Sequence, residues 1–599
     1  MPADACKKRC REALHLFYAI GNCVLLHKST SCTDAQLSRA EQKPRYVRNW
    51  NARVREAHFC SSLGKTCVKV GALPFKGGVY MVQIRNLTIT HRKDLRVIWE
   101  DFSMVLNEGD KAALIGEEGN GKSTLLKLVY DASLVEDYVE YSGEIIKGNA
   151  RIGYLAQELP KEQKDMSVYE FCCQNEQFYE MTPKELSEIS GRLYLPADIF
   201  YSDQRVGALS GGEKVKLQLA KILMEQPDVL FLDEPSNDID IQTLEWLEQF
   251  IQSVKMPVLY ISHDETLLER TANKIIHIEQ IMRKTKSRYT IMALGYQEYV
   301  SRRQSSLAHQ EQVAKKERSE YEKQQERFRQ IQQKVEHQQN SITRQDPHGG
   351  KMLKKKMHAV KSMERRFDKE YENMTEIPET EDAIFIKFGE AISMPNGKRV
   401  LEFAREELWV SQGASEGIGE SGRLLARDIK LSVTGPEHIC IIGKNGAGKT
   451  TLLREIAREL LARTDIKAYY MPQNYEDALD MTVTPVDFLC ETGDREEVSR
   501  IRTYLGSMKY TADEMLHPIE ELSGGQKAKL LLLKMSMAGC EVLILDEPTR
   551  NFSPLSNPVI REMLKNYGGT IISISHDRKY INEVCDTIYE LTEQGLTKK

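Results

Sequence analysis

No stretch of this chain is long and apolar enough to cross a membrane as a helix, which takes about 18 or more consecutive apolar residues. The nearest run, ALHLFYAIGNCVLLH at 13–27, is short and is interrupted by Gly, Asn and Cys. It follows a charged cluster, as the apolar part of a secretory signal would, but a clear small-residue cleavage site is missing. We therefore expect a protein that does not cross a membrane and that is located in the cytoplasm.

The sequence also lacks the paired C-x-x-C spacing that would hold a structural metal. Of its 12 cysteines, half lie in residues 1–80 at irregular intervals, so free thiols are expected there. These six are Cys6, Cys10, Cys23, Cys32, Cys60 and Cys67.

Positive charge is unevenly distributed along the chain. Residues 1–80 hold 14 Lys and Arg against 5 Asp and Glu, whereas the whole chain has a net charge of −5, which leaves −14 on residues 81–599. In MVQIRNLTIT, which begins at Met81, apolar and polar residues alternate, which is typical of a strand that starts directly at this residue. We therefore interpret residues 1–80 as an N-terminal extension that is disordered or not part of the native protein.

Two glycine-rich segments repeat one pattern. GEEGNGKST at 116–124 matches GKNGAGKTT at 443–451, and each follows an apolar strand-like run and opens a helix-like one. Such a loop turns backbone N–H groups and a positive helix end toward a polyphosphate, while its lysine, Lys122 or Lys449, neutralises the outer phosphates. Ser123 and Thr450 then offer hydroxyls to Mg²⁺. The other loop residues expected to contact ATP are Gly116, Gly119, Asn120, Gly121, Thr124, Gly443, Asn445, Gly446, Gly448 and Thr451.

Each half also contains a buried strand that ends in two acidic residues, DVLFLDEP at 228–235 and EVLILDEP at 541–548. Asp233 and Asp546 suit the water shell of the metal. The adjacent carboxylates suit a general base that activates the attacking water, and these are Glu234 and Glu547.

The spacing between motifs is the same in both halves. LSGGE at 209–213 and LSGGQ at 522–526 each begin 24 residues before the strand-end Asp, and His263 and His576 each lie 29 residues after the Glu. An LSGG turn starts a helix and presents backbone N–H groups and a serine hydroxyl, an anion-binding end without a lysine. Each LSGG segment is therefore half of a nucleotide site.

Together these motifs resemble the ATP-binding cassette superfamily over nearly all of residues 81–286 and 383–599. The resemblance implies an α/β fold with two P-loop cassettes, Q-loop residues at Gln157 and Gln473 that reach ATP and its metal, and switch histidines that sense the γ-phosphate. It also implies that each LSGG segment closes over the ATP held by the other cassette of the same monomer. The signature residues of this pairing are Ser210, Gly211, Gly212, Ser523, Gly524 and Gly525.

The two copies differ directly after the general base, where PSNDID at 235–240 becomes PTRNFS at 548–553. In the superfamily this stretch lies near the cassette interface, so the two sites can differ in rate. Both keep the Lys, Gln, Asp, Glu and His of the pattern, and we expect both to hydrolyse ATP. The sequence does not identify the aromatic residue that stacks on adenine.

Residues 287–382 are expected to form a long antiparallel helical-hairpin linker rather than a flexible tether. Apolar residues recur every seven positions from Val300 to Val335 in a background rich in Lys, Arg, Glu and Gln, which is typical of a helix with a narrow apolar seam. DPHGG at 346–350 breaks the pattern, and a second helix is expected from about Lys351 to Tyr371. A first arm of about 45 residues would reach on the order of 65 Å.

Positive charge is concentrated at the turn of this hairpin. Residues 344–369 hold 9 Lys and Arg against 3 Asp and Glu, on an otherwise acidic body. A basic tip held away from an acidic body is where a polyanion would bind. The residues expected to contact RNA are Arg344, Lys351, Lys354, Lys355, Lys356 and Lys361.

Two cassettes, a charged hairpin linker and no membrane domain together resemble the ABC-F family. The resemblance implies an ATPase that binds the ribosome at the tRNA exit site, extends its linker toward P-site tRNA and the peptidyl transferase centre, and leaves after hydrolysis. From the Q-loop to LSGG there are 52 residues in the first cassette and 49 in the second, which leaves no room for the extra helical arm of some general translation factors. This favours the group that includes antibiotic target-protection proteins, but a translation-factor role and the identity of any drug stay open.

The sequence leaves three other classes of protein as alternatives. The ATPase subunit of an importer can also have two fused cassettes, but it has no use for a basic hairpin. An iron–sulfur recycling ATPase would need an ordered cysteine cluster near its N-terminus, which the irregular cysteines do not supply. A structural or DNA-repair cassette protein is the third alternative.

Overall fold

The computed structural model describes residues 82–196, 198–281, 286–341, 347–372, 374, 394–410 and 423–599. These residues belong to one unit of the chain, Val79–Lys599. The expected N-terminal extension, with its six cysteines, lies outside the described residues.

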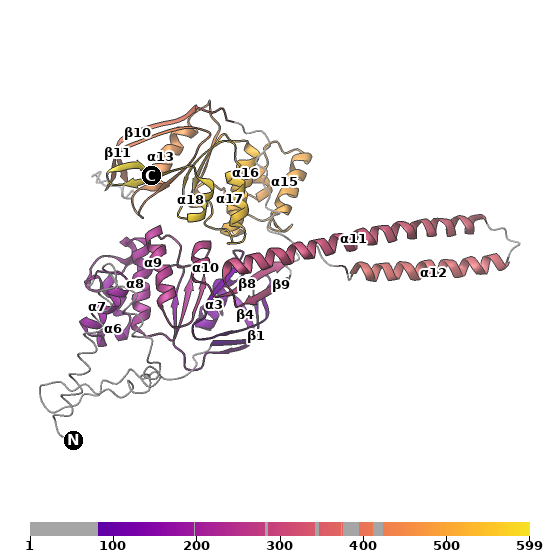
Figure 1. Cartoon of the computed structure of the whole chain (residues 1–599), viewed down its shortest axis with the longest axis horizontal. Coiled ribbons are helices and arrows are strands. Elements are labelled where there is room, and N and C mark those ends of the chain that lie inside the picture. Colours follow the sequence, from indigo (N-terminus) through magenta and orange to yellow (C-terminus); the bar gives the residue numbers. More distant parts are fainter. Residues whose placement is uncertain are drawn as a thin grey trace, which may run out of the picture. The chain divides into compact units, whose positions relative to one another are not determined.

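The first cassette is built on two sheets (Figure 1). A six-stranded sheet has the order β5-β6-β7-β3-β8-β9, in which only β9 is antiparallel, and a three-stranded antiparallel sheet has the order β2-β1-β4. The strands are β1 (Val82–His91), β2 (Val97–Leu106), β3 (Lys111–Gly116), β4 (Val139–Ile146), β5 (Ile152–Leu155), β6 (Val229–Asp233), β7 (Val258–Ile261), β8 (Lys274–Ile281) and β9 (Lys286–Met292). The helices that position the candidate site are α3 (Lys122–Tyr130), α8 (Gly211–Met224), α9 (Ile241–Ser253) and α10 (Glu265–Thr271).

The second cassette repeats this plan. Its six-stranded sheet has the order β13-β14-β15-β12-β16-β17, again with only the last strand antiparallel, and β10 pairs with β11. The strands are β10 (Lys398–Val410), β11 (Arg423–Gly435), β12 (His438–Ile442), β13 (Ala468–Met471), β14 (Val542–Asp546), β15 (Thr570–Ile574), β16 (Thr587–Thr592) and β17 (Gly595–Lys598). The helices are α13 (Lys449–Leu461), α14 (Pro485–Leu489), α15 (Arg495–Ser507), α16 (Gly524–Ala538), α17 (Asn557–Lys565) and α18 (Arg578–Val584).

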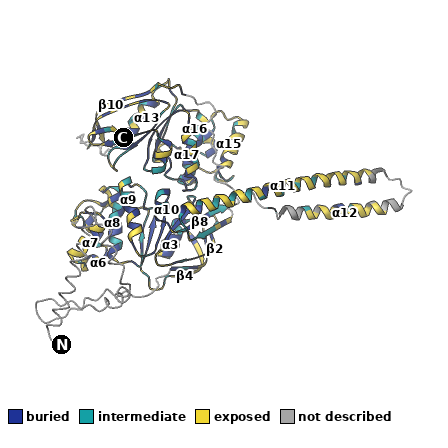
Figure 2. Ribbon diagram, viewed as in Figure 1, coloured by how far each residue is buried: buried dark blue, intermediate teal, exposed yellow. Residues whose placement is uncertain are grey.

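The central strands are apolar because both faces of each large sheet are covered. All five residues of β6 and of β14 are buried. Figure 2 shows buried residues, in dark blue, in the interior of both cassettes. Strands buried on both faces read as continuous hydrophobic runs and not as alternating patterns. The acidic residue that ends each run therefore lies at the carboxyl edge of a parallel sheet, where such folds place their ligand sites.

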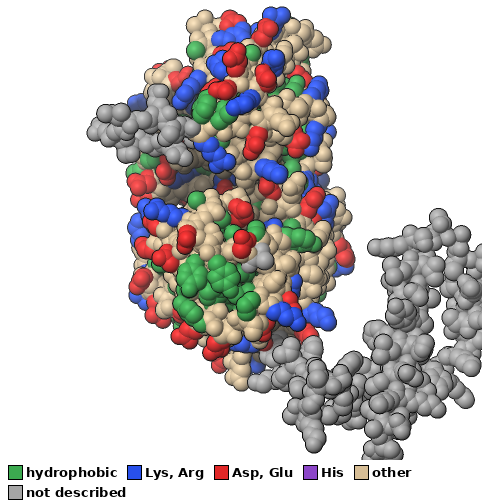
Figure 3. Space-filling view, turned by 90° about the vertical axis from the view of Figure 1, so that its left-hand side faces the viewer, with side chains coloured by type: hydrophobic (Ala, Val, Ile, Leu, Met, Phe, Trp, Pro, Cys, Tyr) green, Lys and Arg blue, Asp and Glu red, His purple; other side chains and the backbone are tan. Residues whose placement is uncertain are grey.

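The part of the first cassette between Gln157 and Leu209 consists of short helices. They are α4 (Lys161–Asp165), α5 (Val168–Cys173), α6 (Glu176–Glu180) and α7 (Pro183–Arg192). On the face that carries α6 and α7, hydrophobic side chains gather on the surface among interspersed charges (Figure 3). In the described residues, this region contains no long inserted arm, as the spacing in the sequence predicted.

The linker forms the expected hairpin of two helices, α11 (Tyr296–Ser341) and α12 (Pro347–Glu372). Val335 and Val360 are buried against each other, and the ring of Phe367 lies 5.4 Å from Phe328 and 6.2 Å from Tyr321. These contacts confirm the seven-residue seam.

The second helix begins at Pro347, which is earlier than the expected Lys351. Proline suits the first turn of a helix, because its missing N–H would have no partner there and its φ is already helical. The two glycines of DPHGG are therefore part of α12.

The basic residues of α12 point to solvent. Lys351, Lys354, Lys355, Lys356 and Lys361 are all exposed, whereas Arg344 lies outside the described residues. Among the helices that the structure describes, none has the length and apolar character needed to span a bilayer.

Candidate active sites

Each glycine-rich loop connects the central strand of its sheet to the following helix, β3 to α3 and β12 to α13. Gly121 and Gly448 precede these helices with φ of 76° and 94°, in the left-handed region. A Cβ on Gly121 would also lie 2.1 Å from Cγ2 of Ile98. Only glycine satisfies both conditions, so the loop can pack closely over the sheet.

The two loop lysines are buried and held by their own loops. Lys122 Nζ donates hydrogen bonds to the carbonyl oxygens of Gly116 and Glu117, both at 2.9 Å, and Lys449 Nζ contacts the equivalent carbonyls at 2.8 and 3.1 Å. Burial lowers the pKa of both amino groups, although nearby carboxylates oppose the shift. A partly desolvated amine at this position binds a phosphate strongly once one enters.

Glu234 directly follows β6 and collects three polar partners. Its carboxylate accepts hydrogen bonds from Gln157 Nε2 at 2.9 Å and Asn237 Nδ2 at 2.6 Å, and it lies 3.3 Å from His263 Nε2. Burial acts to raise the pKa of Glu234, but His263, Lys122 and the Asn237 bond outweigh it and lower the pKa to about 2. The carboxylate is therefore ionised at neutral pH, as a general base must be.

Glu547, the equivalent residue, has fewer donors. It accepts a hydrogen bond from the backbone N–H of His576 at 3.2 Å, and the ring Nε2 of His576 is 3.7 Å away. Burial and the neighbouring Asp546 raise the pKa of Glu547 to about 8, and burial lowers the pKa of His576 to about 4. The pKa is therefore shifted in opposite directions at the two equivalent carboxylates, downward at Glu234 and upward at Glu547.

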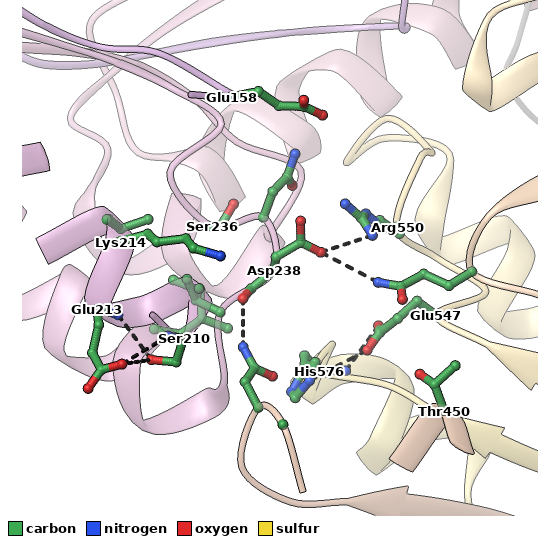
Figure 4. A pocket seen from close by; sticks show the side chains of 18 of the residues that line it. Glu158, Ser210, Glu213, Lys214, Ser236, Asp238, Thr450, Glu547, Arg550 and His576 are labelled. Atoms are coloured by element: carbon green, nitrogen blue, oxygen red, sulfur yellow. Dashed lines mark hydrogen bonds and ion pairs between the residues drawn. The ribbon is translucent and has the colours of Figure 1, made fainter. Parts of the chain in front are cut away.

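Part of this difference in pKa arises because the equivalent side chains of the second cassette contact residues other than Glu547. Gln473 Nε2 lies 3.4 Å from Asp238 Oδ1 in the first cassette, and Arg550 forms an ion pair with the same oxygen at 3.0 Å (Figure 4). Their counterparts in the first copy, Gln157 and Asn237, bind Glu234 instead. The change from PSNDID to PTRNFS thus leaves Glu547 without the counterpart of the Asn237 bond.

Asp233 and Asp546 end their strands close to the loop hydroxyls. Ser123 Oγ donates to Asp233 Oδ1 at 2.8 Å, and Tyr154 OH donates to Oδ2 at 3.0 Å. Asp546 is fully buried, neither of its oxygens has a well-formed hydrogen bond among the described residues, and burial raises its pKa to about 6 despite the nearby Thr450 hydroxyl. A buried carboxylate with unused oxygens beside a hydroxyl fits Mg²⁺, which takes few protein ligands and prefers oxygen.

The two LSGG segments begin helices α8 and α16. Ser210 and Ser523 each accept a hydrogen bond from the backbone N–H three residues on, and Glu213 and Gln526 complete capping boxes. These caps fix the direction of the free N–H groups at the start of each helix.

One cavity of about 810 Å³ brings the first LSGG segment together with the second phosphate loop. In Figure 4, Ser210 and Lys214 face Thr450, Glu547 and His576 across this cavity. The expected site residues that line it are Gln157, Ser210, Gly211, His263, Asn445, Gly446, Lys449, Thr450, Gln473, Asp546, Glu547 and His576. The structure therefore places these residues from both cassettes around one space, which we call the Lys449 site.

The second LSGG segment lies against the first phosphate loop. A Cβ on Gly119 would be 3.9 Å from Cβ of Ser523, and the backbone N–H of Gly525 donates to the carboxylate of Glu118. We call this region, with Lys122 and Glu234 on one side and Ser523 and Gly525 on the other, the Lys122 site. The remaining expected contacts lie in the same loops and helix starts, and these are Asn120, Thr124, Gly212, Thr451 and Gly524.

The sequence did not single out Glu118, Tyr154 or Asp238. Asp238 lies in the stretch that differs between the copies, so the sequence did contain a signal for it. Tyr154 is part of YLAQE beside the Q-loop, but nothing in the sequence indicates its bond to a strand-end Asp. The two Q-loop residues, expected near the metal, contact Glu234 and Asp238 in this structure.

Comparison with known proteins agrees with this architecture. The family described as ABC transporter matches residues 99–237 and 426–550, one segment in each cassette. Ribosome protection protein VmlR of Bacillus subtilis (strain 168) is 28% identical, covering 87% of this chain and 88% of its own length. ABC transporter F family member 5 of Arabidopsis thaliana is 26% identical, covering 88% and 77%.

Among solved structures, the archaeal ribosome recycling factor aABCE1, crystallised with the ribosomal stalk protein aP1, is similar with a TM-score of 0.50. It is 16% identical, and the match covers 86% of this chain and 90% of that one, so it supports the arrangement of two cassettes in one fold. With two cassettes and a helical-hairpin linker, the chain is similar over most of its length to ABC transporter F family proteins, and its two matched cassette segments are those of an ATP hydrolase.

Proposed function

We propose that this protein binds the ribosome while two ATP molecules are held between its cassettes, and that it leaves after hydrolysis. The observation that carries the proposal is the cavity lined by Ser210 of one cassette and by Lys449 and Glu547 of the other. Each half contributes what the other lacks, because the LSGG turn itself contains no cation and the phosphate loop has no second set of donors.

In the Lys449 site, Lys449 and the loop N–H groups bind the outer phosphates, and the start of α8 donates to the terminal phosphate from the opposite side. Phosphate charge then lies between two positive helix ends, which attract it from both cassettes. Cleavage and release of the terminal phosphate removes that bridge, so the cassettes separate. The Lys122 site works in the same way with Ser523 and Gly525.

The chemistry within each site is assigned to a few side chains. Glu234 and Glu547 accept a proton from the attacking water, while His263 and His576 contact the terminal phosphate. Mg²⁺, held by Ser123 and Asp233 or by Thr450 and Asp546, would neutralise phosphate charge and help to keep the neighbouring Glu ionised.

The linker connects this cycle to a distant partner. Tyr296 at the start of α11 donates a hydrogen bond from its hydroxyl to the carbonyl of Pro554 at 3.0 Å, in the segment that follows Glu547. Separation of the cassettes would therefore disturb the base of the hairpin. The exposed lysines of α12 then act at its far end, on ribosomal RNA and P-site tRNA.

The identity of the partner is supported by the relatives. One of them is named a ribosome protection protein, and it aligns with 87% of this chain. We infer that this chain acts on the same particle, either in translation or in protection of the ribosome from a drug.

The test uses a variant that holds ATP but cannot cleave it. Glu234→Gln together with Glu547→Gln should bind ATP and hardly hydrolyse it, because an amide cannot take a proton from water. We expect this variant to sediment with 70S ribosomes in Mg²⁺ and ATP, and wild type to sediment much less.

The matched control adds Lys122→Ala and Lys449→Ala to the same variant, which removes phosphate binding and should return the protein to the supernatant. If the Gln variant stays in the supernatant with ATP, and wild type does so with a non-hydrolysable analogue, the ribosome is not the partner.

A further inference from the structure

The two phosphate loops differ at their third residue, which is Glu118 in the first cassette and Asn445 in the second. In the Lys449 site, Asn445 Nδ2 donates a hydrogen bond to the carbonyl oxygen of Asp238 at 2.6 Å. A neutral amide thus bridges the cassettes there without competing for the donors of the LSGG helix.

In the Lys122 site, a carboxylate occupies one of the equivalent donors of α16. The Glu118 carboxylate accepts the hydrogen bond of the Gly525 backbone N–H, at the first turn of α16. It also lies against Gly524, where an added Cβ would be 3.0 and 3.1 Å from its two oxygens. A carboxylate at a helix start is stabilised by the free N–H groups and by the helix dipole.

Two further observations agree with this placement. The neighbouring Glu117 carboxylate pairs with Lys509 Nζ of the second cassette at 3.3 Å, so both acids of the first loop reach across. The cavity lined by Glu118, Ser523 and Gly525 is about 20 Å³, against about 810 Å³ for the cavity of the Lys449 site. The space between the LSGG segment and the phosphate loop is therefore filled at one site and open at the other.

We propose that Glu118 is an internal competitor of ATP that makes the two sites unequal. Its carboxylate binds the Gly525 N–H of α16, a donor that the terminal phosphate of ATP would use, so ATP can complete the Lys122 site only after Glu118 has moved away. Among the described residues of the second phosphate loop, none places a carboxylate at the start of α8, so the Lys449 site closes on ATP first. This inference rests on the proposed binding of ATP between the cassettes.

The competition has a predictable sign and size. Two negative groups that compete for the same donor repel each other. At a separation of several ångströms in a partly solvated site, this repulsion changes the equilibrium constant of ATP binding by about one to two powers of ten. Replacing Glu118 by Asn, the residue of the other loop, should therefore strengthen ATP binding at the Lys122 site by about 10-fold or more.

The experiment isolates one site at a time. In a Lys449→Ala and Glu234→Gln background, only the Lys122 site binds ATP and none is cleaved, so titration with Mg²⁺ and ATP reports that site. We expect both Glu118→Asn and Glu118→Gln to lower the Kd about 10-fold, because both remove the charge. The reverse exchange, Asn445→Glu in a Lys122→Ala and Glu547→Gln background, should raise the Kd of the Lys449 site.

Two outcomes separate this inference from the proposed function. Ser523→Arg, added to the first background, should weaken ATP binding if the LSGG segment of the other cassette contributes. If Ser523→Arg weakens binding but neither Glu118 variant strengthens it, Glu118 is not a competitor and only this inference is overturned. If Ser523→Arg has no effect, the arrangement of ATP between cassettes is itself wrong.

Discussion

Arg561 shows at the scale of single residues how the two cassettes are held together. Its side chain is only 4% exposed, and it pairs with Glu265 of the first cassette at 2.5 Å and with Glu583 of its own cassette at 2.8 Å. Lys579 also contacts Glu265, at 3.0 Å. A buried charge of this kind is costly when its partner is removed.

Replacing Arg561 by Met should lower the free energy of unfolding by about 2 to 4 kcal/mol, because Glu265 then keeps only Lys579 as a partner. Urea denaturation measures the change. The matched control is Glu583→Gln, which removes a half-exposed partner of the same arginine and should cost less than about 1 kcal/mol. Equal effects of the two substitutions would show that the contact with Glu265 contributes nothing special.

His277 gives a second prediction at this scale. It is buried under the base of α11, its Nδ1 is 2.7 Å from Tyr299 OH, and Glu279 and Arg303 lie beside it. Burial lowers its pKa to about 3, against an ordinary value of 6.5. The folded protein therefore keeps this histidine neutral when the unfolded chain would protonate it.

Above pH 6.5 this histidine does not reduce the free energy of unfolding. As the pH falls from 6.5 toward 3, the free energy of unfolding decreases, because the unfolded chain binds a proton that the folded protein does not. Between pH 7 and pH 5 the loss is at most about 2 kcal/mol. His277→Gln does not titrate, so its free energy of unfolding should fall less over this interval. Parallel decreases in the variant and in wild type would contradict the assignment.

At the scale of elements, the hairpin was predicted well from sequence because its stability depends on local periodicity. The seven-residue recurrence that includes Tyr321, Phe328 and Val335 requires a narrow seam, and these residues do pack against α12. The start of α12 was less predictable, since a Pro-x-Gly-Gly sequence can either end a helix or begin one. The phosphate loops and LSGG turns were identified because each is a continuous segment with fixed residue requirements.

The tip of this element should carry the interaction with RNA. Replacing Lys354, Lys355 and Lys356 with Glu reverses the charge of an exposed stretch of α12 without touching the buried Val360. ATP binding should not change, whereas ribosome-dependent function should be lost and the salt dependence of ribosome binding should become shallower. Unaltered function in this variant would remove the tip from the mechanism.

At the scale of the whole molecule, the least predictable contacts join residues far apart in the chain. The bonds from Gly525 to Glu118 and from Asn445 to Asp238 depend on how two cassettes dock, and no local pattern encodes them. The sequence nevertheless predicted that each LSGG segment would need a phosphate loop from elsewhere, since it presents donors without a cation. The difference between PSNDID and PTRNFS also indicated that the two sites can differ, but the sequence could not show which contacts between the cassettes would make them differ.

The central claim is that each ATP is bound by a phosphate loop of one cassette and an LSGG segment of the other. Paired substitutions test it most directly, in the Glu234→Gln and Glu547→Gln background, by counting the ATP molecules bound tightly per chain. Lys122→Ala with Ser523→Arg should damage one site and leave about one ATP, whereas Lys122→Ala with Ser210→Arg should damage both and leave almost none. The opposite pattern, with tight binding retained only in the second pair, would show that each cassette binds ATP alone and would contradict the account.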